Sequence, residues 1–375
     1  MRVAFTAPMK PLDDPVPSGD RTMGRLIVQA LEAAGHEVTV ATRFRSWRAT
    51  GGTEVQQEVE QAAHAEAERV LSSWEASDYR PDLFLTYHLY HKAPDWIGPA
   101  IASLLGVPYV VVEASRAPKR KTGEWAYGFA AADAALARAD LVAAMHRADR
   151  ECLAAVVPAE RLAVLAPFLD ASQFLQASRI PRREGEPIRL LAIGMMREGA
   201  KLSSYRLLAD ALDRLPGSSR FTLTVAGDGP CRAEVEALFA RHPVTFTGAV
   251  AGEDIPGLCA SHDIFVWPAI REAFGLVFLE AQAAGLAIVG GDTFGVPDIV
   301  AHGRTGLLSS EGNAAAFAEN LAALVSDPAR AADMGLAARD HIRERHTLSS
   351  GADSLDGLLG QALRNFALRA TASPQ

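Results

Sequence analysis

The chain has 375 residues, which exceeds the size at which one hydrophobic core usually keeps growing, so we expect two domains. Its formal net charge of −8 argues against a general nucleic-acid-binding protein, because such proteins are normally basic. Three cysteines without a CxxC pair support neither a disulfide framework nor a zinc site, and a reducing cytosol is the expected compartment.

Short apolar runs alternate with helical patterns through the first half of the chain. We predict strands at 2–7, 36–42, 81–87, 107–114 and 140–145, and helices at 25–35, 95–105 and 124–138. Near-continuous apolar strands interleaved with helices indicate a parallel sheet that is covered on both faces. No run approaches 18 apolar residues, and the opening strand lacks the long apolar core of a signal peptide, so we expect a cytoplasmic protein.

The composition changes near residue 167, where the chain becomes rich in charge, Pro and Gly. We interpret 169–187 as an interdomain linker. The alternation then restarts with strands at 188–194, 221–227, 244–248, 263–268 and 286–291, and with helices at 202–215, 231–242, 314–325, 328–345 and 350–368. We therefore predict an N-terminal Rossmann-like domain over 1–168 and a second one over 188–347.

Ligands of doubly wound folds bind at the carboxyl ends of the strands, which two such domains would place in a cleft between them. The strand at 263–268 leads into REAFGLVFLEAQAAG at 271–285. Gly275 is the expected start of a helix, whose N-terminal N–H groups and positive dipole end can hold a diphosphate. Glu272 precedes this helix, and Glu280 lies inside it, where a carboxylate can accept a pair of hydroxyls. Alternatively, Glu280 is a solvated residue on an amphipathic helix.

The stretch from 271 to 308 resembles the signature of family 4 glycosyltransferases, which have the two-domain GT-B fold. The matching elements are Glu272 and Glu280, Gly285, Gly295-Val296-Pro297-Asp298, and Thr305-Gly306-Leu307. The segments 225–238 and 244–250 resemble further parts of the same domain. The resemblance implies two Rossmann-like parallel-sheet domains facing each other across a cleft. It also implies a helix over 348–368 that crosses back toward the first domain, followed by a flexible tail over 369–375.

The resemblance also implies roles for residues around the helix start. Glu272 would face the transferred sugar near its reacting centre, and Glu280 would hydrogen-bond the nucleotide ribose. The sugar or phosphate would be held by the N–H groups of Phe274, Gly275 and Leu276.

A second implied donor site lies in LAIGMMREGAK at 191–201. Lys201 follows Gly194 by seven residues, as the lysine of the family does, and cations here neutralise the diphosphate leaving group. Met195 stands where the family has an arginine, and Arg197 is the nearest substitute. Gly227 begins the turn GDGPCR, which the resemblance places beside the donor. This turn lacks the third glycine of a dinucleotide-binding GxGxxG, so we reject a dehydrogenase.

By the same resemblance the N-terminal half carries the acceptor. Gly19 lies in the loop that approaches the donor phosphates, and His88 matches the family's histidine at the end of the third strand. Tyr90 and His91 follow it, at the point where that strand opens into the cleft. Glu113 stands where family members commonly have a histidine that contacts the donor sugar. A transferred role, a different sugar specificity and a loss of activity are all open for this position.

Two basic segments follow strands of the N-terminal half, RFRSWR at 43–48 and SRAPKRK at 115–121, the latter beginning with Ser115 and Arg116. In an acidic protein they indicate an anionic acceptor or peripheral contact with an anionic membrane surface, with Phe44 and Trp47 at the interface. Alternatively, both segments are solvated loops.

No DxD motif and no HxxxH spacing occur, so we predict a metal-independent enzyme without a cofactor. The predicted activity is transfer of a sugar from a nucleoside-diphosphate sugar to a carbohydrate, lipid-linked or small-molecule acceptor. Retention of anomeric configuration is implied by the resemblance alone. The alternatives are a phosphorylase or epimerase of the same fold, or a non-catalytic partner that binds nucleotide sugars.

Overall fold

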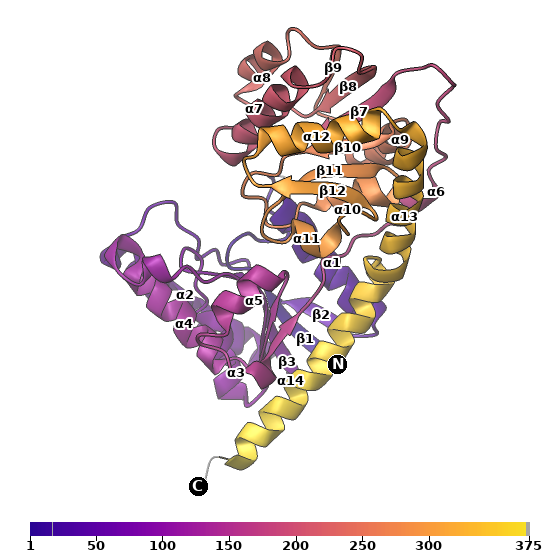
Figure 1. Ribbon diagram of the computed structural model, residues 1–375. Helices are drawn as coiled ribbons and strands as arrows, with labels where there is room; N and C mark the ends of the chain where they lie inside the picture. The colour runs from indigo at the N-terminus through magenta and orange to yellow at the C-terminus, as the bar shows by residue number, and fades with distance from the viewer. Residues whose placement is uncertain (17, 373–375) are drawn as a thin grey trace. The chain divides into compact units, whose positions relative to one another are not determined.

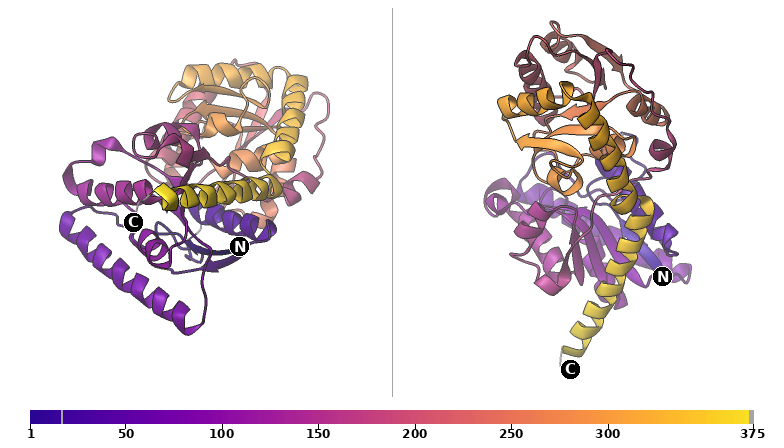
Figure 2. Two further views of the ribbon diagram at one scale, coloured as in Figure 1. Left: turned by 90° about the horizontal axis from the view of Figure 1, so that it is seen from below. Right: turned by 45° about the vertical axis from the view of Figure 1, so that its right-hand side comes forward.

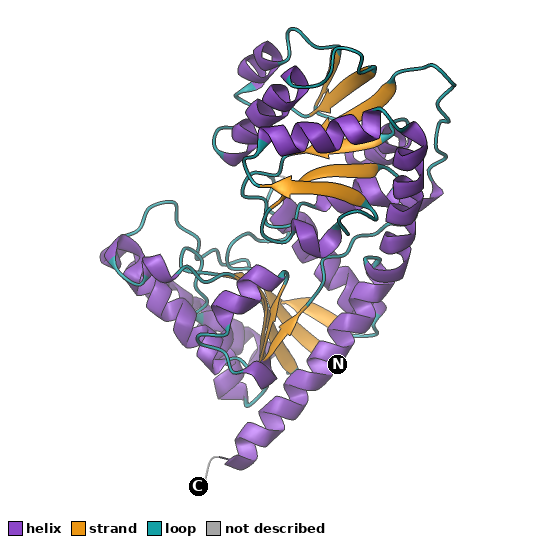
Figure 3. Cartoon of the chain, in the orientation of Figure 1, coloured by secondary structure: helices purple, strands orange, loops and turns teal. Residues whose placement is uncertain are grey.

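The computed structural model describes residues 1–16 and 18–372, and the chain divides into two compact units. Unit 1 comprises Met1–Leu165 and Leu348–Gln375, and unit 2 comprises Ala166–Thr347. Each unit has one parallel six-stranded sheet with helices on both faces (Figures 1 and 3). This confirms the predicted α/β class with two doubly wound sheets. Within the described residues, no helix is long and apolar enough to cross a membrane.

Unit 1 alternates strands and helices along the chain. Its strands are β1 Arg2–Thr6, β2 Glu37–Val40, β3 Leu83–Leu89, β4 Tyr109–Ala114, β5 Leu141–Ala144 and β6 Leu162–Val164. Its helices are α1 Gly19–Ala33, α2 Thr53–Ala76, α3 Ile97–Leu105, α4 Ala126–Arg138, α5 Arg147–Leu153 and α14 Leu348–Ala372. Short 3₁₀ turns lie at Pro118–Arg120, Gly123–Trp125 and Ala159–Arg161.

The strand order of unit 1 is β2-β1-β3-β4-β5-β6, and neighbouring strands are parallel. From β1 the chain crosses to one side to form β2 and then returns to the other side to form β3. The loops after β1 and β3 therefore diverge, and this switch point is where ligands of such sheets bind. The register pairs Thr6, the last residue of β1, with Thr86, and β3 continues beyond it to Leu89.

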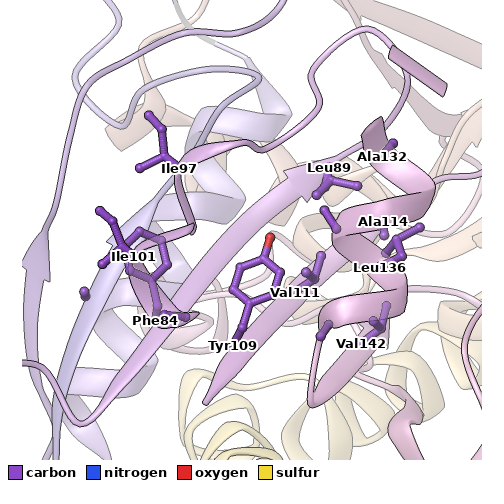
Figure 4. Close-up of a cluster of buried hydrophobic side chains, with 14 of the residues drawn as sticks. Phe84, Leu89, Ile97, Ile101, Tyr109, Val111, Ala114, Ala132, Leu136 and Val142 are labelled. Atoms are coloured by element: carbon purple, nitrogen blue, oxygen red, sulfur yellow. The ribbon is translucent and has the colours of Figure 1, made fainter. Parts of the chain in front are cut away.

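One face of the unit 1 sheet packs against α2, α3 and α4. Phe84, Tyr109 and Val142, from three adjacent strands, meet Ile101 of α3 and Leu136 of α4 in one cluster (Figure 4). All five side chains are almost completely buried, and burying one side chain of this size contributes about 1.5–3 kcal/mol. This packing fixes the strands whose carboxyl ends carry the candidate site residues of unit 1.

Helix α14 belongs to unit 1 although it follows unit 2 in the sequence. It lies beside α1 (Figures 1 and 2), and it also packs against β4 and β5. Leu355, Leu359 and Ala362 are buried on one side of the helix, because they are spaced by four and three residues. The helix continues through 369–372, part of the expected tail, and the rest of that tail, 373–375, lies outside the described residues.

Unit 2 repeats the alternation. Its strands are β7 Ile188–Ile193, β8 Phe221–Ala226, β9 Val244–Gly248, β10 Ile264–Trp267, β11 Ala287–Asp292 and β12 Gly306–Ser310. Its longer helices are α7 Ala200–Asp213, α10 Leu276–Ala283, α12 Ala314–Val325 and α13 Pro328–Arg345. The shorter ones are α6 Ser172–Gln176, α8 Arg232–Leu238, α9 Ile255–Ala260 and α11 Val296–Ile299, and a 3₁₀ turn lies at Gly252–Asp254.

The strand order of unit 2 is β12-β11-β10-β7-β8-β9. The chain goes from β7 outward to β8 and β9 and then returns to form β10 on the other side of β7. The switch point of this sheet therefore lies between β7 and β10, which are paired through Ile264 and Leu190. Helix α7 begins just after β7, and α10 begins shortly after β10, so both helices start at the switch-point end of the sheet.

The sequence prediction omitted the helices α2, α5, α6, α9 and α11 and the strands β6 and β12. Helix α2 covers 24 residues, and the short edge strands β6 and β12 complete the two sheets. The segment 169–187, expected to be a linker, lies in unit 2 and contains α6. Arg179 of this segment donates to the backbone oxygen of His262 at 2.8 Å, so the segment is anchored on unit 2.

Candidate functional site

Lys201 and Glu272 form an ion pair at the switch point of unit 2. Lys201 lies in the first turn of α7, which follows β7, and Glu272 lies in the loop that follows β10. The Lys201 Nζ and the Glu272 Oε2 are 2.5 Å apart, and each side chain is about one fifth exposed. Two residues 71 positions apart in the sequence thus meet at the place where the topology predicts a ligand.

Two glycines allow the ends of β7 and β8 to come close together. Gly227 has a φ of 142°, and a Cβ there would lie 1.9 Å from the backbone oxygen of Gly194. A side chain at position 227 is therefore excluded by the neighbouring backbone. Arg197 lies in the loop before α7 and is exposed, and the structure does not bring it into the Lys201–Glu272 pair.

Helix α10 begins close to Glu272. Gly275 is its N-cap residue and has a φ of 73°, which an L-residue adopts only with strain. Phe274 is buried and anchors the loop, and Leu276 is the first helical residue. The first N–H groups of any helix lack partners within the helix, so this start can receive an anion.

Glu280 lies in the second turn of α10 and is partly buried. Burial raises the pKa of its carboxyl group to about 7, and no nearby charge or hydrogen bond offsets this effect. A partly buried carboxylate without a protein partner is suited to accept hydroxyl groups from a ligand.

In unit 1, Asp20, His88 and Glu113 meet at the carboxyl ends of β1, β3 and β4. The His88 Nδ1 lies 3.1 Å from the Asp20 Oδ1 and 3.7 Å from the Glu113 Oε1. Burial alone lowers the pKa of His88, but the carboxylates of Glu113 and Asp20 outweigh it and raise this pKa to about 9. His88 is therefore positively charged at neutral pH, between two carboxyl groups.

The backbone is strained at two of these three residues. His88 has a φ of 61° and Glu113 a φ of 59°, in the left-handed region that favours glycine. Such strain costs about 1–3 kcal/mol per residue and is concentrated at functional sites. Burial raises the pKa of the Glu113 carboxyl, although the His88 charge opposes this rise. Gly19, beside Asp20, is the first residue of α1, and Ser18 caps this helix by accepting from the Arg21 N–H.

The same three residues form the one group of potential metal ligands found within residues 1–16 and 18–372. One ligand atom from each lies within 4.8 Å of the others. A metal ion binds the neutral form of histidine, whereas Asp20 and Glu113 favour the protonated form of His88. A metal ion would therefore have to displace a proton from this cluster.

The other predicted acceptor-side residues are Tyr90, His91 and Arg116. Two of them form hydrogen bonds with other side chains, and His91 is partly buried. The Tyr90 Oη accepts a hydrogen bond from the Trp47 indole at 3.0 Å. Arg116 donates two hydrogen bonds to Asp133, at 2.9 and 2.8 Å, so it is committed to a structural ion pair. His91 is partly buried, and its burial, with Arg120 and Lys92 nearby, lowers its pKa to about 4. It is therefore neutral at physiological pH.

The two basic segments differ in how far their charges are paired. Arg43 forms an ion pair with Asp13, and the Arg45 guanidinium lies 4.6 Å from the centre of the Trp47 ring. Phe44 packs against the core of unit 1. Lys119 and Lys121 are exposed on and beside a 3₁₀ turn.

Two residues of these sites were missed by sequence reasoning. Asp20 follows Gly19 directly, and its place in the first turn of a switch-point helix is the signal that identifies it. Trp267 ends β10, and its indole N–H lies 3.4 Å from the Glu272 Oε2. A tryptophan at the carboxyl end of a central strand is the corresponding signal in unit 2, because a buried indole N–H needs an acceptor.

The fold is the GT-B fold of glycosyltransferases. Anabaena HepE, solved in complex with UDP, superposes with a TM-score of 0.73 at 18% sequence identity, over 96% of this chain and all of that chain. The lipopolysaccharide outer core galactosyltransferase WaaB superposes with a TM-score of 0.72 at 15% identity, over 97% of this chain and all of that chain. At these identities the likeness shows the fold.

Part of unit 2 matches a known family model. Residues 187–327 match the family model of glycosyl transferases group 1. This segment contains Lys201, Glu272 and Glu280. The resemblance predicted from the spacing of Glu272 and Glu280 is therefore confirmed for this part of the chain.

Curated relatives align mainly over part of their length. Sulfoquinovosyl transferase SQD2 of Arabidopsis thaliana is 36% identical over 168 residues, which are 44% of this chain and 32% of that protein. A D-inositol 3-phosphate glycosyltransferase of Arthrobacter sp. is 34% identical over 167 residues, 44% of this chain and 37% of that protein. The 2-deoxystreptamine glucosyltransferase of Streptomyces kanamyceticus is 29% identical over 255 residues, 62% of this chain and 65% of that protein. The chain thus spans about a third of the length of the first two relatives.

Proposed function

We propose that the chain is a glycosyltransferase that moves a sugar from a nucleoside-diphosphate sugar to an acceptor hydroxyl. The observation that carries this proposal is the Lys201–Glu272 pair at the switch point of unit 2. This unit contains the segment that matches glycosyl transferases group 1. A cation, a carboxylate and a helix start are thereby placed together where a diphosphate and its sugar need them.

Each group at this site has one task in the proposed reaction. Lys201 and the N-terminal N–H groups of α10 stabilise the negative charge that develops on the departing diphosphate. Glu272 accepts hydroxyl groups of the transferred sugar. Glu280, without a protein partner, accepts the hydroxyls of the ribose. Arg197, exposed in the loop before α7, reaches the diphosphate after its side chain turns inward.

The proposed transfer retains the anomeric configuration and needs no metal. The bond between the anomeric carbon and the phosphate oxygen breaks, and a bond from that carbon to the acceptor oxygen forms on the same face. The acceptor proton passes to the departing phosphate oxygen. A strong enzymic base is therefore unnecessary, and fixed N–H groups and a cation can replace a metal as the stabiliser of the leaving group.

We assign the acceptor to unit 1, where Asp20, His88 and Glu113 line the switch point. The two carboxyl groups can accept hydrogen bonds from the hydroxyl groups of the acceptor substrate, and the charged histidine can donate a hydrogen bond to them. This substrate is a carbohydrate, a lipid-linked molecule or a small molecule. Glu113 supplies the second carboxyl group of this cluster. Arg116 stays in its pair with Asp133 and takes no part.

We also propose peripheral contact with anionic membranes through the two basic segments. The exposed Lys119 and Lys121 and the arginines Arg43 and Arg45 supply the charge, each worth about 1 kcal/mol near an anionic surface. Co-sedimentation with vesicles of anionic phospholipid measures this contact. Binding that is equal for the wild type and for Lys119→Glu/Lys121→Glu would refute it.

Release of free nucleoside diphosphate tests the activity directly. The purified protein is incubated with UDP, GDP and ADP sugars, with and without acceptors that include D-inositol 3-phosphate and 2-deoxystreptamine, compounds that appear in the names of two relatives. We expect slow hydrolysis of one donor class, faster turnover with the right acceptor, and loss of both in Glu272→Ala. Chelator in the buffer leaves turnover unchanged if no metal is needed.

The alternatives give different results in the same assay. Tight nucleotide-sugar binding without turnover under any acceptor indicates a non-catalytic binding protein. Release of a sugar 1-phosphate, or conversion of one nucleotide sugar into another, indicates a phosphorylase or an epimerase.

A further inference from the structure

The indole of Trp267 lies beneath the Lys201–Glu272 pair. Trp267 is the last residue of β10 and is completely buried. Its Nε1 donates to the Glu272 Oε2 at 3.4 Å, and the Lys201 Nζ lies 5.3 Å from the centre of its ring. One side chain therefore contacts both members of the ion pair, through its polar edge and its aromatic face.

The indole N–H makes this contact specific. A buried tryptophan N–H is a donor only, and leaving it without an acceptor destabilises the fold. The Glu272 carboxylate is the acceptor that the structure gives it. Glu272 Oε2 consequently receives hydrogen bonds from both Lys201 and Trp267, which fix the carboxylate from two directions.

The ring itself is held in place by its neighbours. Tyr205 of α7 packs edge-on against it, with ring centres 5.0 Å apart and an interplanar angle of 79°. The Tyr205 Oη donates to the backbone oxygen of Gly194 at 2.7 Å. A Cβ at Gly194 would lie only 2.9 Å from the Trp267 ring, so the ring packs directly against the end of β7.

A second contact joins the same two segments. The Ile270 N–H donates to the Ser204 Oγ of α7 at 3.0 Å. The loop after β10 is strained, because Ala269 and Arg271 have φ values of 57° and 50°. A strained loop keeps its conformation only where its surroundings hold it, and Ser204 and Trp267 supply that support.

We propose that Trp267 is a positioning residue for the sugar-transfer reaction. Its indole N–H orients the Glu272 carboxylate, and its ring face keeps the Lys201 ammonium at the start of α7. The proposal rests on the proposed glycosyltransferase function, because it assumes that Glu272 and Lys201 act on the donor. Trp267 is completely buried, so in this proposal it acts through Glu272 and Lys201.

Indole N–H resonances test the contact without any need for activity. The chain has five tryptophans, so a ¹H–¹⁵N spectrum of the indole-labelled protein has few signals, and loss of one in Trp267→Phe assigns Trp267. We expect Glu272→Ala to shift the Trp267 signal more than any other indole signal, because the N–H loses its acceptor. An unmoved Trp267 signal overturns the proposal.

Kinetics test the positioning. Trp267→Phe keeps an aromatic ring against Lys201 and Tyr205 but removes the N–H. With the donor that the wild type turns over, we expect kcat to fall about tenfold and the donor KM to stay within about twofold, since misplaced groups slow the chemical step. Trp74→Phe removes an indole N–H from a buried position on α2 and should leave both constants unchanged.

The NMR experiment and the kinetic experiment together distinguish failure of the inference from failure of the proposed function. If kcat is unchanged in Trp267→Phe, or falls equally in Trp74→Phe, Trp267 does not position the pair. If the wild type turns over no donor and the Trp267 signal still moves in Glu272→Ala, the proposed function fails, and so does the catalytic part of this inference. The hydrogen bond would then be structural.

Discussion

At the scale of single residues, the proposed function requires the Lys201–Glu272 pair to reorganise when a donor binds. The Lys201 ammonium forms an ion pair with the Glu272 carboxylate. A partly exposed ion pair of this kind contributes little to stability, typically 0–1 kcal/mol. The lysine can therefore exchange its carboxylate partner for a phosphate at small cost.

Lys201→Ala should lower kcat/KM. The expected loss of transition-state stabilisation is roughly 2–4 kcal/mol, the scale for one preorganised electrostatic contact. Removing the cation leaves the departing diphosphate without its compensating charge. Arg241→Ala is the matched control, because it removes a strongly exposed cation from the same unit. Steady-state rates of nucleoside diphosphate release measure the effect, and equal rates for Lys201→Ala and the wild type would contradict the assigned role.

Glu280→Gln should change stability in a pH-dependent way. The folded pKa of about 7 is above the unfolded value of about 4.3, so the folded protein binds more protons than the unfolded chain between these pH values. Stability therefore falls as the pH rises through this window and stays low above it. We expect Glu280→Gln to raise the Tm at pH 8 more than at pH 5, measured by thermal unfolding.

The same variant should weaken nucleoside-diphosphate binding about tenfold or more, because hydrogen bonds to a charged acceptor contribute roughly 1.5–3 kcal/mol. Glu319→Gln, on an exposed part of α12, is the control and should affect neither property. A gain in Tm that is equal at both pH values would show that burial of the Glu280 charge is not its origin.

At the scale of elements, the start of α10 decides where Glu272 lies. A Cβ at Gly275 would lie 3.1 Å from the Glu272 Cγ and 3.1 Å from the Phe278 ring, in a residue with a φ of 73°. Gly275 thus allows the backbone to turn with a positive φ, and it leaves room for the Glu272 carboxylate. The elements themselves follow from local patterns, but the crowding at this turn exists only in the folded unit.

Gly275→Ala should destabilise the protein by about 1–2 kcal/mol through left-handed strain and should also abolish most donor turnover by displacing Glu272. Gly312→Ala separates the two effects, because Gly312 has a φ of 80° and open space around its Cβ position. We expect it to lose similar stability and to keep its activity. Denaturant unfolding and donor hydrolysis measure both, and equal activity in the two variants would be evidence against the placement role.

At the scale of the molecule, α14 completes unit 1 from the far end of the chain. Arg369 forms an ion pair with the fully buried Asp140 at 2.8 Å, while Arg138 lies 3.9 Å from the same carboxyl group. The Tyr109 N–H also donates to Asp140 at 2.9 Å, so one buried acid connects α14 to two strands. The first and last parts of the chain therefore fold as one unit.

Arg369→Ala should destabilise unit 1 by about 1–3 kcal/mol, because it leaves a buried carboxylate with a weaker partner. This value is below that of a fully buried pair, since Arg369 is about one third exposed. Hydrogen exchange should speed up in α14 and α1 but not in unit 2. Arg343→Ala, which breaks an exposed pair on α13, is the control. Faster exchange throughout both units would contradict a local effect.

The sequence predicted most strands and helices because their apolar spacing is local. Helix α2 was missed, although Val59, Ala63, Ala67 and Val70 recur at its buried positions. The helix was missed because alanine side chains are small and most residues around them are charged or polar, so the apolar side of the helix is hard to recognise in the sequence. The edge strands β6 and β12 were missed for a similar reason, because each is short and its strand character comes from pairing with one neighbour.

Part of the candidate site was likewise predictable from the sequence, and part of it depends on the tertiary structure. By itself the sequence predicted the two doubly wound sheets, the resemblance of unit 2 to group 1 glycosyl transferases, and the candidate roles of Glu272, Glu280 and Lys201, since these predictions depend on spacing along the chain. Only the tertiary structure decided that Lys201 meets Glu272 above Trp267, and that Asp20 joins His88. Crossover connections determine which strand ends become neighbours, and no local pattern contains that information.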